Sequence, residues 1–304
     1  MFAALLDEGR AQSNAVQEVL DTLSTDALFG AGRFLVRYPD SAEVVIRVAR
    51  ARMRRDSTTA ELRQALAYRG HFNDAYEVIA RSHWRAPDYA NWGAQRLFGG
   101  LAEFGAFPAD TVDEVLNEWL DEDWGAGAST GLRWWAARRD TGAINRFLEL
   151  GERTIQSAPS LGVAAADTGF VRWVIRMASA HLALAQGDTT GALGQLEVIR
   201  PWPAATFVHT LRLTRAQLLA ATGQDREAAE ILDQMSQLEL APDPLDVIWV
   251  LERARINERL GKYDKAIRDY SYVMDAWRSA DALLRPFVEE ARAAVARLAG
   301  EPRG

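Results

Sequence analysis

The 304-residue chain contains no cysteine. Disulfide frameworks, zinc sites with thiolate ligands and a cysteine nucleophile are therefore excluded. No uncharged apolar stretch approaches the roughly 18 residues that a membrane-spanning helix needs. Acids at Asp7 and Glu8 interrupt the opening residues before an apolar run of signal-peptide length develops. We therefore expect no membrane insertion and a cytoplasmic location.

Lysine is also scarce, because only Lys262 and Lys265 are present and every other base is arginine. We interpret this preference for arginine, together with the abundant alanine, as a result of the nucleotide-composition bias of the source genome. The 35 basic and 42 acidic residues give a formal charge of −7. A negative balance argues against a protein that coats nucleic acid, since such binding depends on neutralised phosphates.

Runs of alternating β-branched residues, which would predict strands, are absent from the sequence. Good helix formers fill most segments instead. The last segment shows the helical period clearly, with Pro286 at the expected start and apolar side chains on one face at Phe287, Ala291, Ala294, Val295 and Leu298. The sequence therefore predicts an all-α fold.

A short turn motif recurs four times between helical stretches. A glycine ends the first stretch and an alanine follows five residues later, at Gly70/Ala75, Gly187/Ala192, Gly223/Ala228 and Gly261/Ala266. Glycine tolerates the left-handed conformation that terminates many helices, so each motif predicts a turn between two paired helices. The expected N-terminal caps of the second helices are Asn73, Thr190, Asp225 and Asp264. The last three copies are spaced by 36 and 38 residues.

These units resemble tetratricopeptide (TPR) repeats, in which about 34 residues form a pair of helices. The family's small residue on the first helix corresponds here to Ala180, Ala216 and Ala254. Its Ala-x3-aromatic pair on the second helix corresponds to Ala192/Leu196, Ala228/Leu232 and Ala266/Tyr270, with weaker copies at Ala75/Ile79 and Ala143/Phe147. The family's first-helix aromatic is replaced by Arg176, Arg212 and Val250.

The resemblance implies a right-handed α-solenoid of about six or seven helical hairpins with a C-terminal capping helix. We expect residues 1–150 to form a degenerate array and residues 169–304 to form the better-matched repeats. The interval of 49 residues between Ala143 and Ala192 is too long for one unit, which places an extended connection at residues 151–168. The C-terminal repeats are also similar to the TPR regions of bacterial regulatory and kinase-associated proteins.

Motifs of catalytic, cofactor and metal sites are absent. The sequence has no Gly-x4-Gly-Lys-Ser/Thr, no Gly-x-Gly-x2-Gly after a strand, no His-Glu-x2-His and no Gly-x-Ser-x-Gly. Seven acids between Asp110 and Asp123 are compatible with a cation site or with a solvated helix face, but they lack the pattern of a calcium loop. We therefore expect no enzymatic activity, no cofactor and no metal.

We predict a protein–protein interaction scaffold that binds a peptide or a partner protein in the concave groove of the solenoid. The resemblance places the first helices on this groove, with expected partner contacts at Met177, His181, Leu184, Leu213, Gln217, Leu251, Arg255, Glu258 and Arg259. A secondary patch comprises the arginine stripe of Arg47, Arg50 and Arg54 together with the pair Trp134 and Trp135. The plainer alternatives for this patch are a salt-bridged helix face and core packing.

Two other functions stay open at this point. The chain fits a regulatory or sensor segment of a larger signalling protein, such as a bacterial Ser/Thr kinase. It also fits a helical repeat that binds nucleic acid along the arginine stripe. The identity of the partner and the oligomeric state are not encoded in any motif that we identify.

Overall fold

The computed structural model describes residues 22, 35, 39–53, 60–81, 84–86, 92–122, 126–157, 168–199, 206–234 and 243–300. Within these residues every regular element is a helix and none is a strand, which confirms the all-α prediction. Among the described helices, none combines the length and the apolar character that a bilayer crossing requires. Of the predicted connection at 151–168, residues 158–167 lie outside the described residues, and residues 151–157 are the last part of a helix that begins at Thr141.

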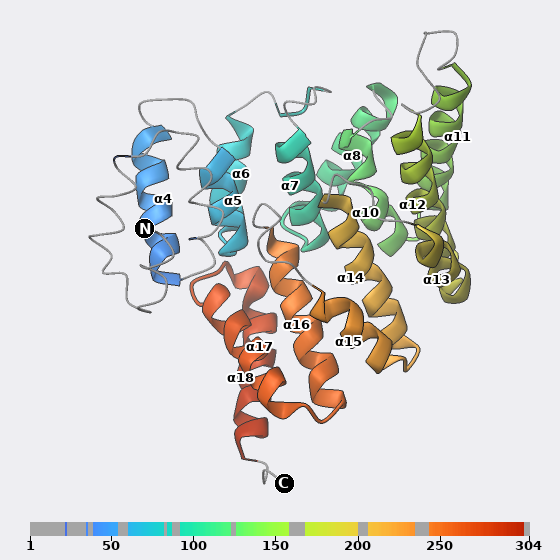
Figure 1. The fold of residues 1–304 in the computed structure, drawn as a ribbon. Helices are drawn as coiled ribbons and strands as arrows, with labels where there is room; N and C mark the ends of the chain where they lie inside the picture. Colours follow the sequence, from blue (N-terminus) through green and yellow to red (C-terminus); the bar gives the residue numbers. More distant parts are fainter. Residues whose placement is uncertain are drawn as a thin grey trace. The chain divides into compact units, whose positions relative to one another are not determined.

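The chain forms two compact units. Unit 1 combines residues 1–82, 236–258 and 262–304, and unit 2 comprises residues 83–235 and 259–261. The helices of unit 1 in Figure 1 are α4 (Pro39–Met53), α5 (Ala60–Tyr68), α6 (Phe72–Ala80), α16 (Pro244–Arg259), α17 (Tyr263–Ala276), η3 (Ala282–Leu284) and α18 (Arg285–Ala299). Here α4 packs on α5, α5 on α6, and α17 on α18.

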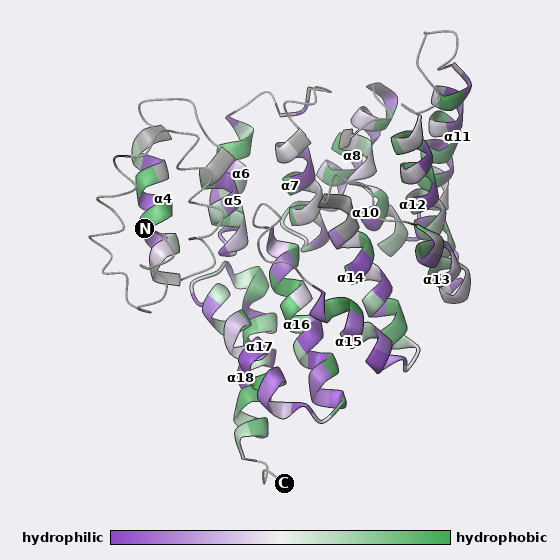
Figure 2. Cartoon of the chain, in the orientation of Figure 1, coloured by the Kyte–Doolittle hydropathy of each residue, from purple (hydrophilic) through white to green (hydrophobic). Residues whose placement is uncertain are grey.

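Unit 2 is an array in which helices adjacent in sequence pack on one another. Its helices are α7 (Trp92–Glu103), α8 (Ala109–Glu122), α9 (Ala126–Ser129), α10 (Leu132–Ala137), α11 (Thr141–Ser157), α12 (Gly169–Ala185), α13 (Thr189–Val198), α14 (Thr206–Ala221) and α15 (Asp225–Asp233). From α10 to α15 each helix packs against the next, and α10 also contacts α12. Figure 2 shows both polar and apolar positions along these helices, as expected for helices that bury one face.

The predicted hairpin turns are confirmed. Gly70, Gly187, Gly223 and Gly261 all adopt the left-handed region, with φ between 69° and 80°, at the end of the first helix of a pair. A fifth turn of this kind, between α10 and α11, has Arg139 in the left-handed position with φ 58°. The turn geometry is therefore common to all five pairs, and glycine removes its steric cost in four of them.

The predicted helix caps are wrong by one or two residues. Asn73, Thr190 and Asp264 are each the second residue of their helix, and Asp225 is the first residue of α15. The cap follows the left-handed residue directly, because that turn ends one helix and starts the next within two residues. Of the four cap positions in these hairpins, Asp188 alone binds a helix N–H through its side chain, at 2.8 Å from Gly191 N.

The small residues identified from the repeat pattern do lie in the core. Ala180, Ala216 and Ala254 on the first helices have no exposed surface. The second-helix pairs are also buried at Ala75/Ile79, Ala192/Leu196, Ala228/Leu232 and Ala266/Tyr270. The copy at Ala143 is misplaced by one residue, because Ile144 is buried there and Ala143 is partly exposed. The left-handed residue of that turn is Arg139, so the following helix starts one residue later than the motif implies.

Within unit 1, the end of α5 and the start of α6 dock against the end of α17 and the residues that follow it. We call residues 68–73 and 275–281 together the capping junction. The indole Nε1 of Trp277 donates to the carbonyl of Tyr68, the last residue of α5, at 3.1 Å. Arg69 Nη2 donates to the carbonyl of Asp275, in the last turn of α17, at 2.7 Å. Carbonyls at helix ends lack intrahelical partners, so each segment satisfies a carbonyl of the other.

Asp281 completes the capping junction on the other side of the turn. Its Oδ2 accepts from the backbone N–H of Asn73 at the start of α6, at 3.1 Å, across 208 residues of sequence. Its own N–H donates to the carbonyl of Gly70 at 3.0 Å. The local cap residue of α6, His71, makes no side-chain cap bond. In a solenoid, each hairpin is expected to contact only the hairpins next to it in the sequence. These contacts between distant segments are therefore not predicted by the repeat pattern.

We predict that Gly70→Ala destabilises the protein far more than Gly223→Ala. The two glycines share nearly the same φ, 79° and 80°, so the conformational cost of a side chain, about 1–2 kcal/mol, is common to both. A Cβ at Gly70 would lie 2.5 Å from Ala280 Cβ, whereas nothing lies within 4 Å of one at Gly223. Overpacking adds about 1–3 kcal/mol at Gly70 alone. Urea unfolding followed by circular dichroism measures both losses, and equal losses would contradict the packing of the capping junction.

Candidate functional site

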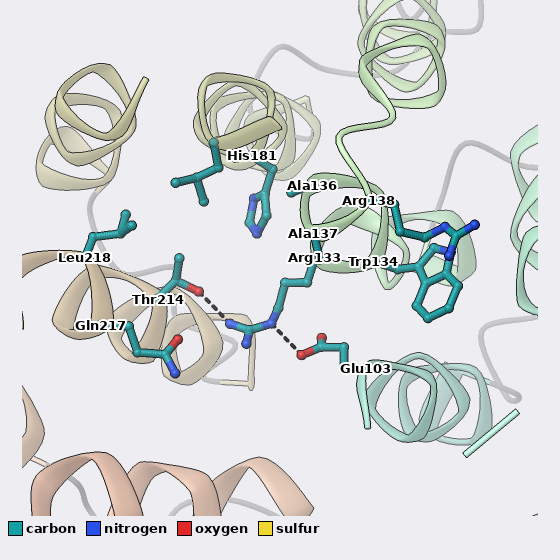
Figure 3. A pocket seen from close by; sticks show the side chains of 11 residues that line it. Glu103, Arg133, Trp134, Ala136, Ala137, Arg138, His181, Thr214, Gln217 and Leu218 are labelled. Atoms are coloured by element: carbon teal, nitrogen blue, oxygen red, sulfur yellow. Dashed lines mark hydrogen bonds and ion pairs between the residues drawn. The ribbon is translucent and has the colours of Figure 1, made fainter. Parts of the chain in front are cut away.

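Unit 2 contains a pocket of about 440 Å³ that opens between α7, α10, α12 and α14. Figure 3 shows its lining from close by. The residues that line it are Glu103, Arg133, Trp134, Ala136, Ala137, Arg138, His181, Leu184, Thr214, Gln217 and Leu218. Pockets that hold small ligands or anchoring side chains have volumes of about 300–1,000 Å³, so this pocket is large enough to bind one.

Helical spacing explains why these side chains meet. Three of the contributing helices, α10, α12 and α14, are each the first helix of a hairpin. On each of them lining residues recur after three or four positions, which places these residues on one face, and on α10 Trp134 also lines the pocket beside Arg133. The sets are Arg133/Ala136/Ala137 on α10, His181/Leu184 on α12 and Thr214/Gln217/Leu218 on α14.

Arg133 connects three helices at the wall of the pocket. Its Nε donates to Glu103 Oε2 of α7 at 2.7 Å, and its Nη1 donates to Thr214 Oγ1 of α14 at 2.6 Å. The side chains of Arg133 and Glu103 are only 20% and 16% exposed, so solvent screens this pair weakly. The carboxylate offsets the guanidinium charge and leaves the pair neutral overall.

The ring of His181 points toward Arg133 in Figure 3, and the residue is 2% exposed. Its Nδ1 is 2.9 Å from the carbonyl oxygen of Met177. A carbonyl can only accept, so Nδ1 carries the hydrogen and Nε2 has a free lone pair. Nε2 is buried and has no hydrogen-bond partner in the protein. Burial lowers the pKa of His181 to about 4, and the charge of Arg133 also lowers it, so the ring is neutral at pH 7.

Trp134 and Arg138 form another wall of the pocket. Trp134 Nε1 donates to Asp113 Oδ1 at 2.7 Å, and the Arg138 guanidinium lies 5.0 Å from the centre of the indole ring. This cation–π contact places the Arg138 guanidinium over one face of the half-buried indole ring. Its neighbour Trp135 is 1% exposed and belongs to the core. The predicted tryptophan pair thus divides between surface and core, and only Trp134 can contact a partner.

Three of the predicted partner contacts, His181, Leu184 and Gln217, come together in this pocket with Trp134 of the predicted secondary patch. Others that the family resemblance placed on the groove are buried and, unlike His181, do not line the pocket. These are Met177 at 4%, Leu213 at 1% and Leu251 at 0% exposure. Their helices are buried on more than one side, so the position within the repeat does not by itself place a residue at the surface.

The charged residues predicted on α16 are engaged in ion pairs within the protein. Arg255 donates to Glu290 at 2.5 and 2.6 Å and to Glu252 at 2.8 Å, and its hydrogen bonds to Glu290 raise its pKa. Glu258 accepts from the Tyr270 hydroxyl at 2.8 Å and pairs with Arg297.

Arg259 belongs to unit 2 and binds Asp225 of the same unit through two guanidinium nitrogens, at 2.7–3.1 Å. Its hydrogen bonds hold the pKa of Asp225 below the ordinary value. Of the three charged residues predicted on α16, each therefore has a partner inside the protein. These charges are therefore already paired within the protein.

The arginine stripe and the acidic cluster also participate in ion pairs. Arg50 binds Asp74 at 2.7 Å, Arg47 is exposed, and Arg54 lies outside the described residues. In the cluster, Glu114 and Glu118 pair with Arg85, and Asp121 pairs with Arg146. No group of three potential metal ligands occurs in the part of the chain that the structure describes.

Sequence reasoning missed the polar residues that give the pocket its character, Glu103, Arg133 and Thr214. Glu103 and Thr214 lie 30 and 81 residues from Arg133. No local pattern links residues at such separations. The one available signal was the helical spacing of Thr214 with Gln217, a residue that was already predicted.

We predict that His181 makes the protein less stable as the pH falls from about 6.5 to about 4. In this range the unfolded imidazole binds a proton, whereas the folded one, whose pKa is about 4, stays neutral. The full effect amounts to about 3 kcal/mol, and above pH 6.5 it is absent. His181→Phe keeps a ring in the core and should flatten the pH dependence of the unfolding free energy in this window. Parallel curves for the two proteins would contradict the neutral, buried state of His181.

Comparison of the chain with models of known protein families, with curated proteins and with solved structures gave no match. The chemistry of the pocket is therefore the basis for any functional proposal.

Proposed function

We propose that the chain is a TPR-like array of helical hairpins, a right-handed solenoid in the family's manner, that binds a segment of a partner protein. The binding site is the pocket formed by α10, α12 and α14. The main supporting observation is that this pocket collects the first helix of three consecutive hairpins, α10/α11, α12/α13 and α14/α15. The family resemblance assigns partner binding to first helices. The proposed cellular location is the cytoplasm, which the absence of cysteine fits.

The composition of the pocket suits a protein partner. Leu184, Leu218, Ala136 and Ala137 supply apolar contact, and half-buried Trp134 supplies an aromatic surface. Anchoring side chains in protein interfaces typically fill such partly apolar pockets, with a few polar groups that orient them. Arg133 and His181 are the orienting groups here.

Binding without catalysis is the simpler account of these residues. The Glu103 carboxylate is paired with Arg133, and the Thr214 hydroxyl donates to the carbonyl of Thr210 at 3.0 Å. His181 has no hydroxyl or thiol nucleophile hydrogen-bonded to it. Among the residues that line the pocket there is therefore no nucleophile activated by a base.

We predict that Leu184→Glu, at the pocket, abolishes partner capture, while Leu283→Glu does not. Leu184 is partly exposed, so a carboxylate there places charge in the binding surface without filling the core. Leu283 of η3 is 40% exposed and outside the pocket, which makes it a matched control for the same substitution. Purified proteins are used as bait in a lysate of the source organism, with and without nuclease, and bound proteins are quantified by mass spectrometry. We expect at least a tenfold loss of a stoichiometric partner for Leu184→Glu alone.

Two results would contradict the proposal. Equal capture by Leu184→Glu and the unchanged protein would exclude the pocket as the binding site. Recovery of nucleic acid that disappears after nuclease treatment would favour binding along the arginine stripe instead. Circular dichroism and thermal unfolding of each variant check that the helices are intact.

A further inference from the structure

The pocket wall contains a buried hydrogen-bond acceptor that the protein leaves unused. His181 lines the pocket and is 2% exposed, and its buried Nε2 has no hydrogen-bond partner. A buried polar atom without a hydrogen bond costs about 1–3 kcal/mol, so such atoms in folded proteins are rare. The other ring nitrogen is already bound to the Met177 carbonyl, which fixes which nitrogen is free.

The free lone pair restricts what can bind. A carboxylate or phosphate without a proton has nothing to donate to Nε2. Protonation of the ring would permit an anion, but burial and the nearby Arg133 both oppose a positive charge on His181. A ligand that satisfies this atom must therefore bring an N–H or O–H group.

Charge further narrows the class of ligand. A cationic donor would approach the Arg133 guanidinium, whose compensating carboxylate, Glu103, already accepts a hydrogen bond from its Nε. Arg133 also uses Nη1 for Thr214, and its Nη2 makes none of these bonds. The wall thus offers an acceptor at His181 and a donor at Arg133, with the amide of Gln217 and the guanidinium of Arg138 also in the lining, and the Arg133–Glu103 pair is neutral. Leu184, Leu218 and two alanines supply apolar surface around them.

We propose that the pocket binds an uncharged group that both donates and accepts hydrogen bonds, such as an amide or a hydroxyl, carried on an apolar body. Its N–H or O–H donates to His181 Nε2, and its oxygen accepts from Arg133 Nη2. This inference rests on the proposed function, since it describes the anchoring group of the partner protein. Charged side chains of that partner are excluded from the position next to His181.

The test uses three small probes of nearly the same shape with the full-length chain. Benzamide is neutral and both donates and accepts, benzoate is an anion that only accepts, and benzamidine is a cation that only donates. Ligand-detected NMR titrations at pH 7 give the dissociation constants, which for molecules of this size lie in about the millimolar range. We expect benzamide to bind at least tenfold more tightly than either of the other two.

His181→Phe provides the matched variant, because it retains an aromatic ring and removes the acceptor. We expect it to weaken benzamide about tenfold, as the loss of one hydrogen bond implies, and to leave benzoate unchanged. The three probes are ranked on the unmodified protein. This ranking therefore remains a valid test even if His181→Phe fails to fold. Tighter or equal binding of benzoate or benzamidine would overturn the inference, as would benzamide binding that His181→Phe leaves unaltered.

Failure of this inference differs from failure of the proposed function. If none of the probes binds at millimolar concentration, the assigned chemistry is wrong. Loss of partner capture in Leu184→Glu would still support the pocket as a protein-binding site in that case. If Leu184→Glu captures its partner normally while benzamide binds as expected, the pocket holds a small uncharged ligand and the partner site lies elsewhere.

Discussion

The left-handed residue between paired helices is the constraint on which the rest of the structure depends. It ends one helix and lets the next start within two residues, so that the two helices run side by side. A residue with a side chain pays about 1–2 kcal/mol for this conformation, which explains why glycine fills it at Gly70, Gly187, Gly223 and Gly261. Arg139 accepts the same geometry between α10 and α11. In unit 2 these reversals place α10 in contact with α12, and from this packing the pocket arises.

At Gly70 the same turn has a second structural role. The absence of a Cβ lets the backbone approach Ala280 and Trp277, and this closeness brings Tyr68 and Asn73 within hydrogen-bonding reach of the second segment. The helix ends of each segment are then capped by the other. Arg69 is buried in the process, and burial lowers the pKa of its guanidinium. The carbonyls at the C-terminal end of α17 carry partial negative charge, which offsets part of this cost.

The pocket and the capping junction both bury polar groups. In the junction, backbone carbonyls at helix ends find partners within the chain, although Nε and Nη1 of Arg69 are buried without hydrogen bonds. In the pocket, Arg133 is bound to Glu103 and Thr214, whereas His181 Nε2 is left without a partner. The backbone hydrogen bonds of the junction hold helices together. In the pocket, His181 Nε2 can still accept a hydrogen bond from a ligand. Fold alone does not decide function, so this chemistry adds to the arrangement of the three first helices in supporting the proposed binding role.

Much of the architecture was predictable from the sequence because it is encoded locally. Glycine at a helix end, alanine five residues later and the spacing of apolar residues act over one or two helical turns, and they correctly located the turns and the buried alanines such as Ala216 and Ala254. The cap positions and Ala143 were misplaced by one or two residues, since a small register change leaves the local pattern almost unaltered.

The features that only the tertiary structure decided involve residues that are far apart in the sequence. Whether Leu213 and Leu251 are buried, or Leu184 and Gln217 exposed to a pocket, follows from which helices pack on each side of their own, and the repeat pattern carries no such information. Asp281 as the cap of α6 and Arg133 as the link between Glu103 and Thr214 also join residues that no local pattern relates. The sequence by itself determined the helices and their turns through local conformational preference. The pocket and the capping junction exist only after folding has brought distant polar groups into hydrogen-bonding range.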